Sequence, residues 1–93
     1  GLIANTVKRS LAYSLENDGQ LDEAITLYDG LVGVFERETS GEMLWAAARC
    51  LLAQNKPDEA KKRLQRILDE FPESSFQVQA RVELARLAPT LLN

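Results

Sequence analysis

The chain has 93 residues and a net charge of −3 at neutral pH, with 45% hydrophobic and 27% charged residues. This size and composition indicate one small globular domain with a thin core, and the acidic balance argues against a nucleic-acid partner, which usually needs a basic stripe. There is no histidine and one cysteine, Cys50, so the commonest general base and metal ligand and any intrachain disulfide are absent. No apolar run approaches the roughly 18 residues that suggest a membrane-spanning helix.

Two amphipathic helices are predicted in the first part of the chain. The first runs from about residue 4 to 17 and ends at Asn17-Asp18-Gly19, a typical helix stop. Its apolar face consists of residues spaced by four: Ile3, Val7, Leu11 and Leu15. The second helix starts near Gln20 and its apolar stripe continues to Phe35. Gly30 and Gly33 fall inside that stripe, and we expect them to allow a neighbouring helix to approach closely.

Three further helices are predicted in the rest of the chain. Thr39-Ser40-Gly41-Glu42 fits a capping box and starts the third, and the fourth begins at Pro57 and stops at Phe71-Pro72. Ser74-Ser75-Phe76-Gln77 fits a second capping box and starts the fifth, which ends before Pro89, and residues 90–93 are expected to form a loose tail. The fifth helix carries two apolar lines, which suit a helix that covers the end of a stack: Ala80, Leu84 and Leu87, and Val78, Val82 and Ala85.

A short sequence motif occurs twice in the chain. Gly19-Gln20-Leu21-Asp22-Glu23-Ala24 and Asn55-Lys56-Pro57-Asp58-Glu59-Ala60 each separate two helical segments, and their alanines are 36 residues apart. A helix–turn–helix period of this length indicates an α-solenoid. The residues resemble the tetratricopeptide repeat. The matching positions are Leu11-Ala12, Gly19, Ala24 and Tyr28 in the first copy and Ala47-Ala48, Ala60 and Pro72 in the second.

The resemblance implies an all-α solenoid of antiparallel helix pairs with about five helices. Residues 1–93 then form a single domain, with repeat one at about 4–38, repeat two at about 40–73 and a closing helix at about 75–88. The sequence departs from the family where Lys8 and Leu44 replace an early Trp, Leu15 a Tyr and Leu64 an aromatic residue, and where the first copy lacks a final Pro.

Two features of the sequence bear on its origin. Because it begins at Gly1 without Met, we expect a piece of a longer protein. The repeat end Phe71-Pro72-Glu73-Ser74-Ser75 resembles bacterial versions of the repeat, which is compatible with the cytoplasm or the periplasm.

The sequence predicts no catalytic residue, no metal site and no cofactor. Asp22-Glu23 and Asp58-Glu59 lie in first helical turns, where negative charge favours the helix dipole. Cys50 lacks a histidine to activate it, so we expect it to pack as a small apolar residue, and no glycine-rich phosphate loop is present. The basic residues Lys61, Lys62, Arg63 and Arg66 are expected to pair with Glu59, Asp69 and Glu70 on a solvated face.

The resemblance places the first helix of each pair on a concave surface, where binding residues are expected. Residues one step off the packing stripe there are Thr6, Arg9, Tyr13, Glu16, Glu42, Trp45, Arg49, Leu52, Gln79, Val82 and Arg86. The binding candidates among them are Arg9, Tyr13, Trp45, Arg49 and Arg86, because arginines and aromatic side chains anchor interfaces and arginine grips carboxylates. Alternatively, Trp45 packs against a neighbouring helix and the arginines are only solvated.

Two functions remain open at this point. The first is a non-catalytic protein–protein interaction module whose groove holds a peptide or protein segment with an acidic group and an apolar side chain. The Lys and Asn residues of chaperone-binding members are missing, which argues against chaperone tails as ligands. The second is a structural role, as a homodimer or a scaffold segment of a larger assembly, because a two-repeat stack has little core and exposed ends.

Overall fold

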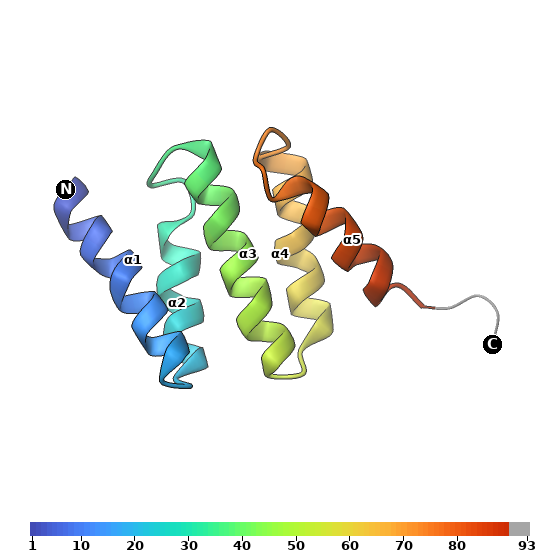
Figure 1. Ribbon diagram of the computed structural model, residues 1–93, viewed down its shortest axis with the longest axis horizontal. Coiled ribbons are helices and arrows are strands. Elements are labelled where there is room, and N and C mark those ends of the chain that lie inside the picture. The colour runs from blue at the N-terminus through green and yellow to red at the C-terminus, as the bar shows by residue number, and fades with distance from the viewer. Residues whose placement is uncertain (90–93) are drawn as a thin grey trace.

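A computed structural model describes residues 1–89 as five helices, each packed against the next (Figure 1). The helices are α1 Leu2–Asn17, α2 Leu21–Leu31, α3 Arg37–Ala53, α4 Pro57–Glu70 and α5 Gln77–Leu87. In Figure 1, α1, α3 and α5 lie toward the viewer, and α2 and α4 lie behind them. No strand occurs within the described residues. The predicted all-α solenoid of antiparallel helix pairs is therefore confirmed. The tail predicted at residues 90–93 lies outside the part that is described.

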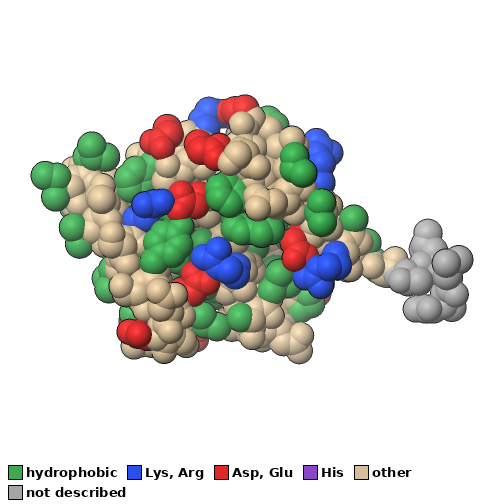
Figure 2. Space-filling view, in the orientation of Figure 1, with side chains coloured by type: hydrophobic (Ala, Val, Ile, Leu, Met, Phe, Trp, Pro, Cys, Tyr) green, Lys and Arg blue, Asp and Glu red, His purple; other side chains and the backbone are tan. Residues whose placement is uncertain are grey.

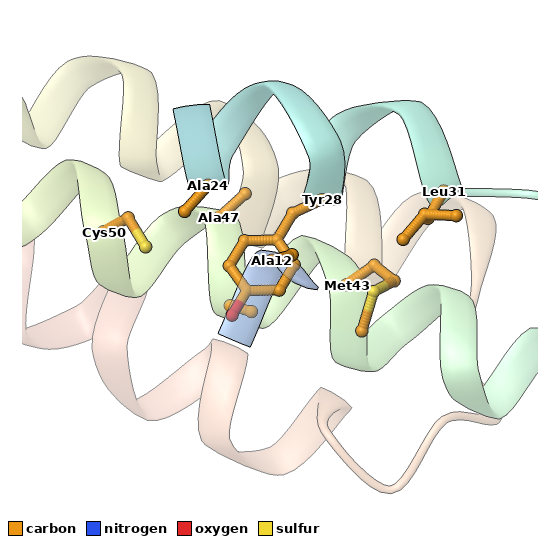
Figure 3. Close-up of a cluster of buried hydrophobic side chains, with 8 residues drawn as sticks. Ala12, Ala24, Tyr28, Leu31, Met43, Ala47 and Cys50 are labelled. Atoms are coloured by element: carbon orange, nitrogen blue, oxygen red, sulfur yellow. The ribbon is translucent and has the colours of Figure 1, made fainter. Parts of the chain in front are cut away.

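Two buried clusters form the core, and α3 contributes to both. The first joins α1, α2 and α3 around Tyr28, whose side chain is fully buried (Figure 3). The second joins α3, α4 and α5 around Leu44, Leu64 and Ile67. All three residues of Ala46-Ala47-Ala48 are buried, Ala48 in the second cluster and the other two in the first. Small side chains at these positions let helices pack against both sides of α3.

The repeated motif forms the turn inside each helix pair. Gly19 has φ +80°, and Asn55 has φ +59° at the equivalent place in the second copy. Glycine and asparagine adopt this left-handed conformation at lower cost than other residues. Pro57 then lies in the first turn of α4, as predicted, where its missing N–H leaves no helical bond unmade. The two copies of the motif therefore form the same tight turn with different residues.

The helix α2 is shorter than predicted, and the expected role of its glycines is wrong. It ends at Leu31, and Gly33 has φ +85° in the turn that follows, where its N–H donates to Ser40 Oγ (2.9 Å). A Cβ added to Gly30 or Gly33 would meet nothing within 4 Å, so neither residue permits a close approach. The close approach is instead at Gly41, where a Cβ would lie 2.7 Å from Ser74 Cβ.

Neither predicted capping box forms. The helix α3 begins at Arg37 rather than at Thr39, and the Thr39 hydroxyl donates back to the Glu36 carboxylate. Before α5, which begins at Gln77, Ser75 donates its N–H (2.8 Å) and its hydroxyl to Glu38 of α3. The hydroxyl groups of Thr39 and Ser75 therefore bind other partners, and the contact of Ser75 joins segments 37 residues apart.

The apolar face predicted for the first helix is largely exposed. The exposed fractions are 83% for Ile3, 62% for Val7 and 49% for Leu11, and Leu2 beside them is 72% exposed. The helix α2 covers a different side of α1, where Ala12 is buried. In α5, the line of Ala80 packs into the second cluster as expected, whereas Val78 and Val82 of the other line stay exposed.

Candidate binding groove

The face formed by α1, α3 and α5 contains two gaps between its helices. The first gap lies between α1 and α3, and the second gap lies between α3 and α5. Figure 2 shows this face, on which acidic, basic and hydrophobic side chains alternate. The side chains that define the first gap are Arg9, Tyr13, Glu16, Glu42 and Arg49. Those that define the second gap are Trp45, Ala48, Leu52, Val78, Val82, Glu83 and Arg86.

The half of the first gap near the start of α3 is closed around the Glu42 carboxylate. One of its oxygens accepts hydrogen bonds from Arg9 Nη2 (2.6 Å) and from the Tyr13 hydroxyl. The Arg9 guanidinium lies 5.5 Å from the centre of the Tyr13 ring, and the Tyr13 ring meets Tyr28 edge-on with 5.4 Å between centroids. Burial, together with the bond to Glu42, raises the pKa of Tyr13 to about 12.

The half of the first gap near the end of α1 is closed around the Glu16 carboxylate. Arg49 donates to both of its oxygens from Nε (2.5 Å) and Nη2 (2.7 Å), and the Tyr28 hydroxyl donates to Oε1 (2.7 Å). The hydrogen bond from Arg49 holds the pKa of Glu16 below its ordinary value. Because the three residues come from α1, α2 and α3, this carboxylate joins three helices.

Cys50 lies beneath this network and is fully buried. Burial raises the pKa of its thiol to about 11, with a further contribution from the negative charge of Glu16. The thiolate is the reactive form of cysteine, so the thiol stays protonated and inert near neutral pH. The predicted packing role of Cys50 agrees with its place in the first core cluster.

The second gap contains two hollows that share Trp45 and Glu83. The deeper one has a volume of about 130 Å³ and is lined by Trp45, Ala48, Arg49, Leu52, Leu64 and Glu83. The shallower one has a volume of about 300 Å³ and is lined by Trp45, Val78, Gln79, Val82, Glu83 and Arg86. Trp45 is half-buried, and its ring centroid is 6.1 Å from that of Phe76. Within the described residues, no side-chain hydrogen bond joins α3 to α5.

All five predicted binding residues lie on this face, but in different gaps. Arg9 and Tyr13 are in the first gap, Trp45 and Arg86 are in the second, and Arg49 borders both. None of the three arginines is merely solvated, because Arg9 binds Glu42, Arg49 binds Glu16 and Arg86 binds Glu83 (2.6 Å).

The carboxylate partners of these arginines were not predicted, although the sequence carries a signal for two of them. Arg9 and Glu42 are 33 residues apart, and so are Glu16 and Arg49. This spacing is close to the repeat period and brings residues of successive first helices together. Opposite charges at that separation would have revealed both pairs.

The basic residues of α4 pair largely as predicted, on the opposite layer of the molecule. Arg66 binds Glu70 (2.8 Å) and Lys62 lies 3.4 Å from Glu59. Arg63 has a partner that was not predicted, Asp29 of α2, at 2.8 Å. These residues do not reach the groove.

The fold and the groove define a helical-repeat protein, and the family is established by comparison. The sequence profile of the tetratricopeptide repeat matches residues 15–82, which is more than half of the chain. The chain therefore belongs to the tetratricopeptide repeat family. Repeats of this family are generally protein–protein interaction modules and are generally non-catalytic. No curated protein and no solved structure matches the chain.

Two further properties concern the described residues alone. None of the helices in residues 1–89 has the length and apolar character needed to cross a membrane. In the same part of the chain, no group of three or more Asp, Glu or Cys side chains is placed to hold a metal ion.

Proposed function

We propose that this domain binds a peptide or protein segment on the face of α1, α3 and α5, and that the segment carries an acidic group and an apolar side chain. The observation that carries the proposal is the orientation of the three ion pairs on this face. In each pair the arginine side chain is more exposed than its carboxylate: 37% against 22% for Arg9–Glu42, 44% against 16% for Arg49–Glu16 and 62% against 22% for Arg86–Glu83.

This orientation exposes the arginine of each pair more than its carboxylate, although each pair is neutral. The carboxylates hold the guanidinium groups in place, and the arginine side chains are the more exposed members of the pairs. Arginine binds carboxylates through parallel N–H groups in a fixed plane, so a guanidinium that is already held loses little freedom when a second carboxylate binds. Trp45 between the arginines supplies the apolar contact.

The proposal is tested by selecting binders from a displayed library of random peptides and comparing two arginine variants. Arg86→Gln removes a guanidinium from the groove. Arg81→Gln is the matched control, because Arg81 is also exposed on α5 but binds Gln77 and lines neither hollow. We expect peptides enriched in Asp and Glu, bound about threefold to fivefold more weakly by Arg86→Gln than by Arg81→Gln. No enrichment of binders, or equal affinities of the two variants, would contradict the proposal.

A second candidate function, self-association, is favoured by the exposed stripe of α1. This stripe consists of Leu2, Ile3, Val7 and Leu11 and occupies one end of the molecule. The first fifteen residues contain no Asp or Glu, so a second copy of the chain could cover the stripe without burying a carboxylate. Sedimentation equilibrium over a dilution series tests it: a dimer that Val7→Gln dissociates is expected, and a monomer at every concentration would exclude it.

A further inference from the structure

We propose that the second gap is the subsite that selects the ligand: its deeper hollow takes one aliphatic side chain, and Arg86 takes a carboxylate next to it in the peptide. The first gap is a closed part of the scaffold and takes no ligand group. This inference rests on the proposed function and assigns the recognition to one of the two gaps.

A single spacing relates the two gaps and shows where they differ. In the first gap, residues 33 apart form the ion pairs Arg9–Glu42 and Glu16–Arg49. The same spacing applied to α3 and α5 pairs Trp45 with Val78 and Arg49 with Val82. The polar partners of the first gap are therefore replaced by valines in the second. Val78 and Val82 are 58% and 63% exposed, which leaves apolar surface uncovered beside Trp45.

Both carboxylates of the first gap are already paired, so a ligand group would have to displace an arginine or a tyrosine, although the buried Arg9 Nε has no partner among the described residues. Glu42 accepts two hydrogen bonds and Glu16 accepts three, and the Tyr13 ring packs against Tyr28. A ligand that entered would have to break bonds to partly buried charges, and an unpaired buried charge is costly.

The second gap can take an aliphatic group without breaking any hydrogen bond. The deeper hollow is lined by the apolar side chains of Trp45, Ala48, Leu52 and Leu64, and has a volume of about 130 Å³. Pockets for whole small molecules are typically about 300–1,000 Å³, whereas a dry apolar cavity of about 150 Å³ holds a group the size of benzene. The hollow therefore matches one leucine-sized side chain better than a complete small ligand.

The charges at the edge of the second gap favour an acidic neighbour for that side chain. Arg49 borders the deeper hollow and Arg86 the shallower one, and both arginine side chains are more exposed than those of their glutamate partners. Glu83, which borders both hollows, is only 22% exposed and is held by Arg86. A peptide carboxylate would thus meet guanidinium N–H groups, and a peptide lysine would be repelled by them.

The first experiment varies the peptide. Three acetylated and amidated hexapeptides serve as probes: Ser-Gly-Leu-Glu-Gly-Ser, the same peptide with Ala for Leu, and the same peptide with Gln for Glu. Each is titrated while the fluorescence of Trp45 is recorded. We expect the Leu–Glu peptide to bind about tenfold more tightly than the Ala peptide and about threefold more tightly than the Gln peptide. Equal affinities, or no binding of any of the three, would overturn the inference.

The second experiment varies the protein at two matched valines. Val82→Gln changes the second gap, and Val7→Gln changes α1 at a site of nearly equal exposure, 63% against 62%. We expect Val82→Gln to weaken binding of the Leu–Glu peptide by about fivefold, and Val7→Gln to leave it unchanged. Equal effects of the two substitutions would contradict the inference.

Backbone amide NMR separates failure of this inference from failure of the proposed function. Peptides selected from the library are added to isotope-labelled protein, and shifts are expected around Trp45 and Val82. If the selected peptides shift the signals of Arg9 and Tyr13 but not those of α5, the groove binds peptides and the second gap is not the selective subsite. If no peptide shifts any signal on this face, both proposals fail.

Discussion

The two gaps in the groove face have the same helical surroundings and opposite contents. In the first gap, two carboxylates accept five hydrogen bonds from arginine and tyrosine side chains. In the second, Trp45 borders hollows of about 130 and 300 Å³, and two valines border the larger one. Each gap lies between two neighbouring helices of the same layer, so the same arrangement of helices occurs twice. The side chains decide whether that space stabilises the stack or receives a ligand.

The comparison also explains why α3 is central. It offers Glu42 and Arg49 to the first gap and Trp45 and Leu52 to the second. Arg49 touches both, because its guanidinium is bound to Glu16 while its side chain borders the deeper hollow. Variants of α3 therefore affect both gaps, and the clearest tests use α1 and α5.

The largest difference is expected between two glutamates. Glu16→Ala removes the acceptor of Arg49 and Tyr28, and should lower the free energy of unfolding by about 2 to 3 kcal/mol, because bonds to charged groups are the stronger ones. Glu83→Ala removes a pair within α5 whose Arg86 is 62% exposed, and should change the free energy of unfolding much less. Urea unfolding measures both, and similar losses would show that the two gaps do not differ.

The contact between Gly41 and Ser74 should have the next largest effect. Gly41→Ala places a Cβ against Ser74 in the turn before α5, and should destabilise the fold by about 1 to 2 kcal/mol despite the better helix propensity of alanine. Ser74→Gly removes the obstructing atoms. In a double-mutant cycle the two substitutions should therefore cost less together than the sum of their separate effects, and strict additivity would show that the contact does not matter.

The stability supplied by the first gap should depend on pH. Because the folded-state pKa of Glu16 is lowered by Arg49, its contribution is complete well above the ordinary value of 4.5 and is lost as the pH falls through 4.5 to the folded-state pKa. Glu16→Gln resembles the protonated form. The variant should be about 1 kcal/mol less stable than the natural chain near neutral pH, and the difference should shrink as the pH falls below 4.5. A difference that does not change with pH would contradict this account.

The smallest effect on stability is expected from a substitution that makes the second gap resemble the first. Val82→Glu introduces a carboxylate at the place where the spacing of the first gap would put a partner for Arg49. Unfolding should shift by no more than about 0.5 kcal/mol, because Val82 is 63% exposed. Binding of the Leu–Glu peptide should nevertheless fall below detection, since the new carboxylate repels that of the peptide. Retained affinity would contradict the assignment of the subsite.

Much of the fold could be predicted from the sequence because its signals are local. The repeated motif containing Gly19 and Asn55 specifies both turns inside the helix pairs, and Pro57 marks the first turn of α4. The helix starts near Thr39 and Ser74 were wrong because their hydroxyl groups have other partners. The exposed stripe of α1 was misjudged because periodicity identifies an apolar face and does not tell whether another helix covers it.

The candidate site could be predicted only in part. The repeat pattern was sufficient to place Arg9, Tyr13, Trp45, Arg49 and Arg86 on one face, and their role in binding remains a prediction. The division into a closed and an open gap depends on which side chains meet across 33 residues, and on the depth of the space left between them. Those properties follow from packing in three dimensions, which no local pattern contains.

The most direct test of the central claim is acrylamide quenching of Trp45 fluorescence over a dilution series. Trp45 is the single tryptophan of the chain and borders both hollows of the second gap. If the second gap is open, acrylamide should quench Trp45 at every protein concentration, and the Leu–Glu peptide should protect it. Protection of Trp45 at all concentrations without peptide, or quenching that develops only on dilution, would show that the second gap is closed or covered by another copy of the chain.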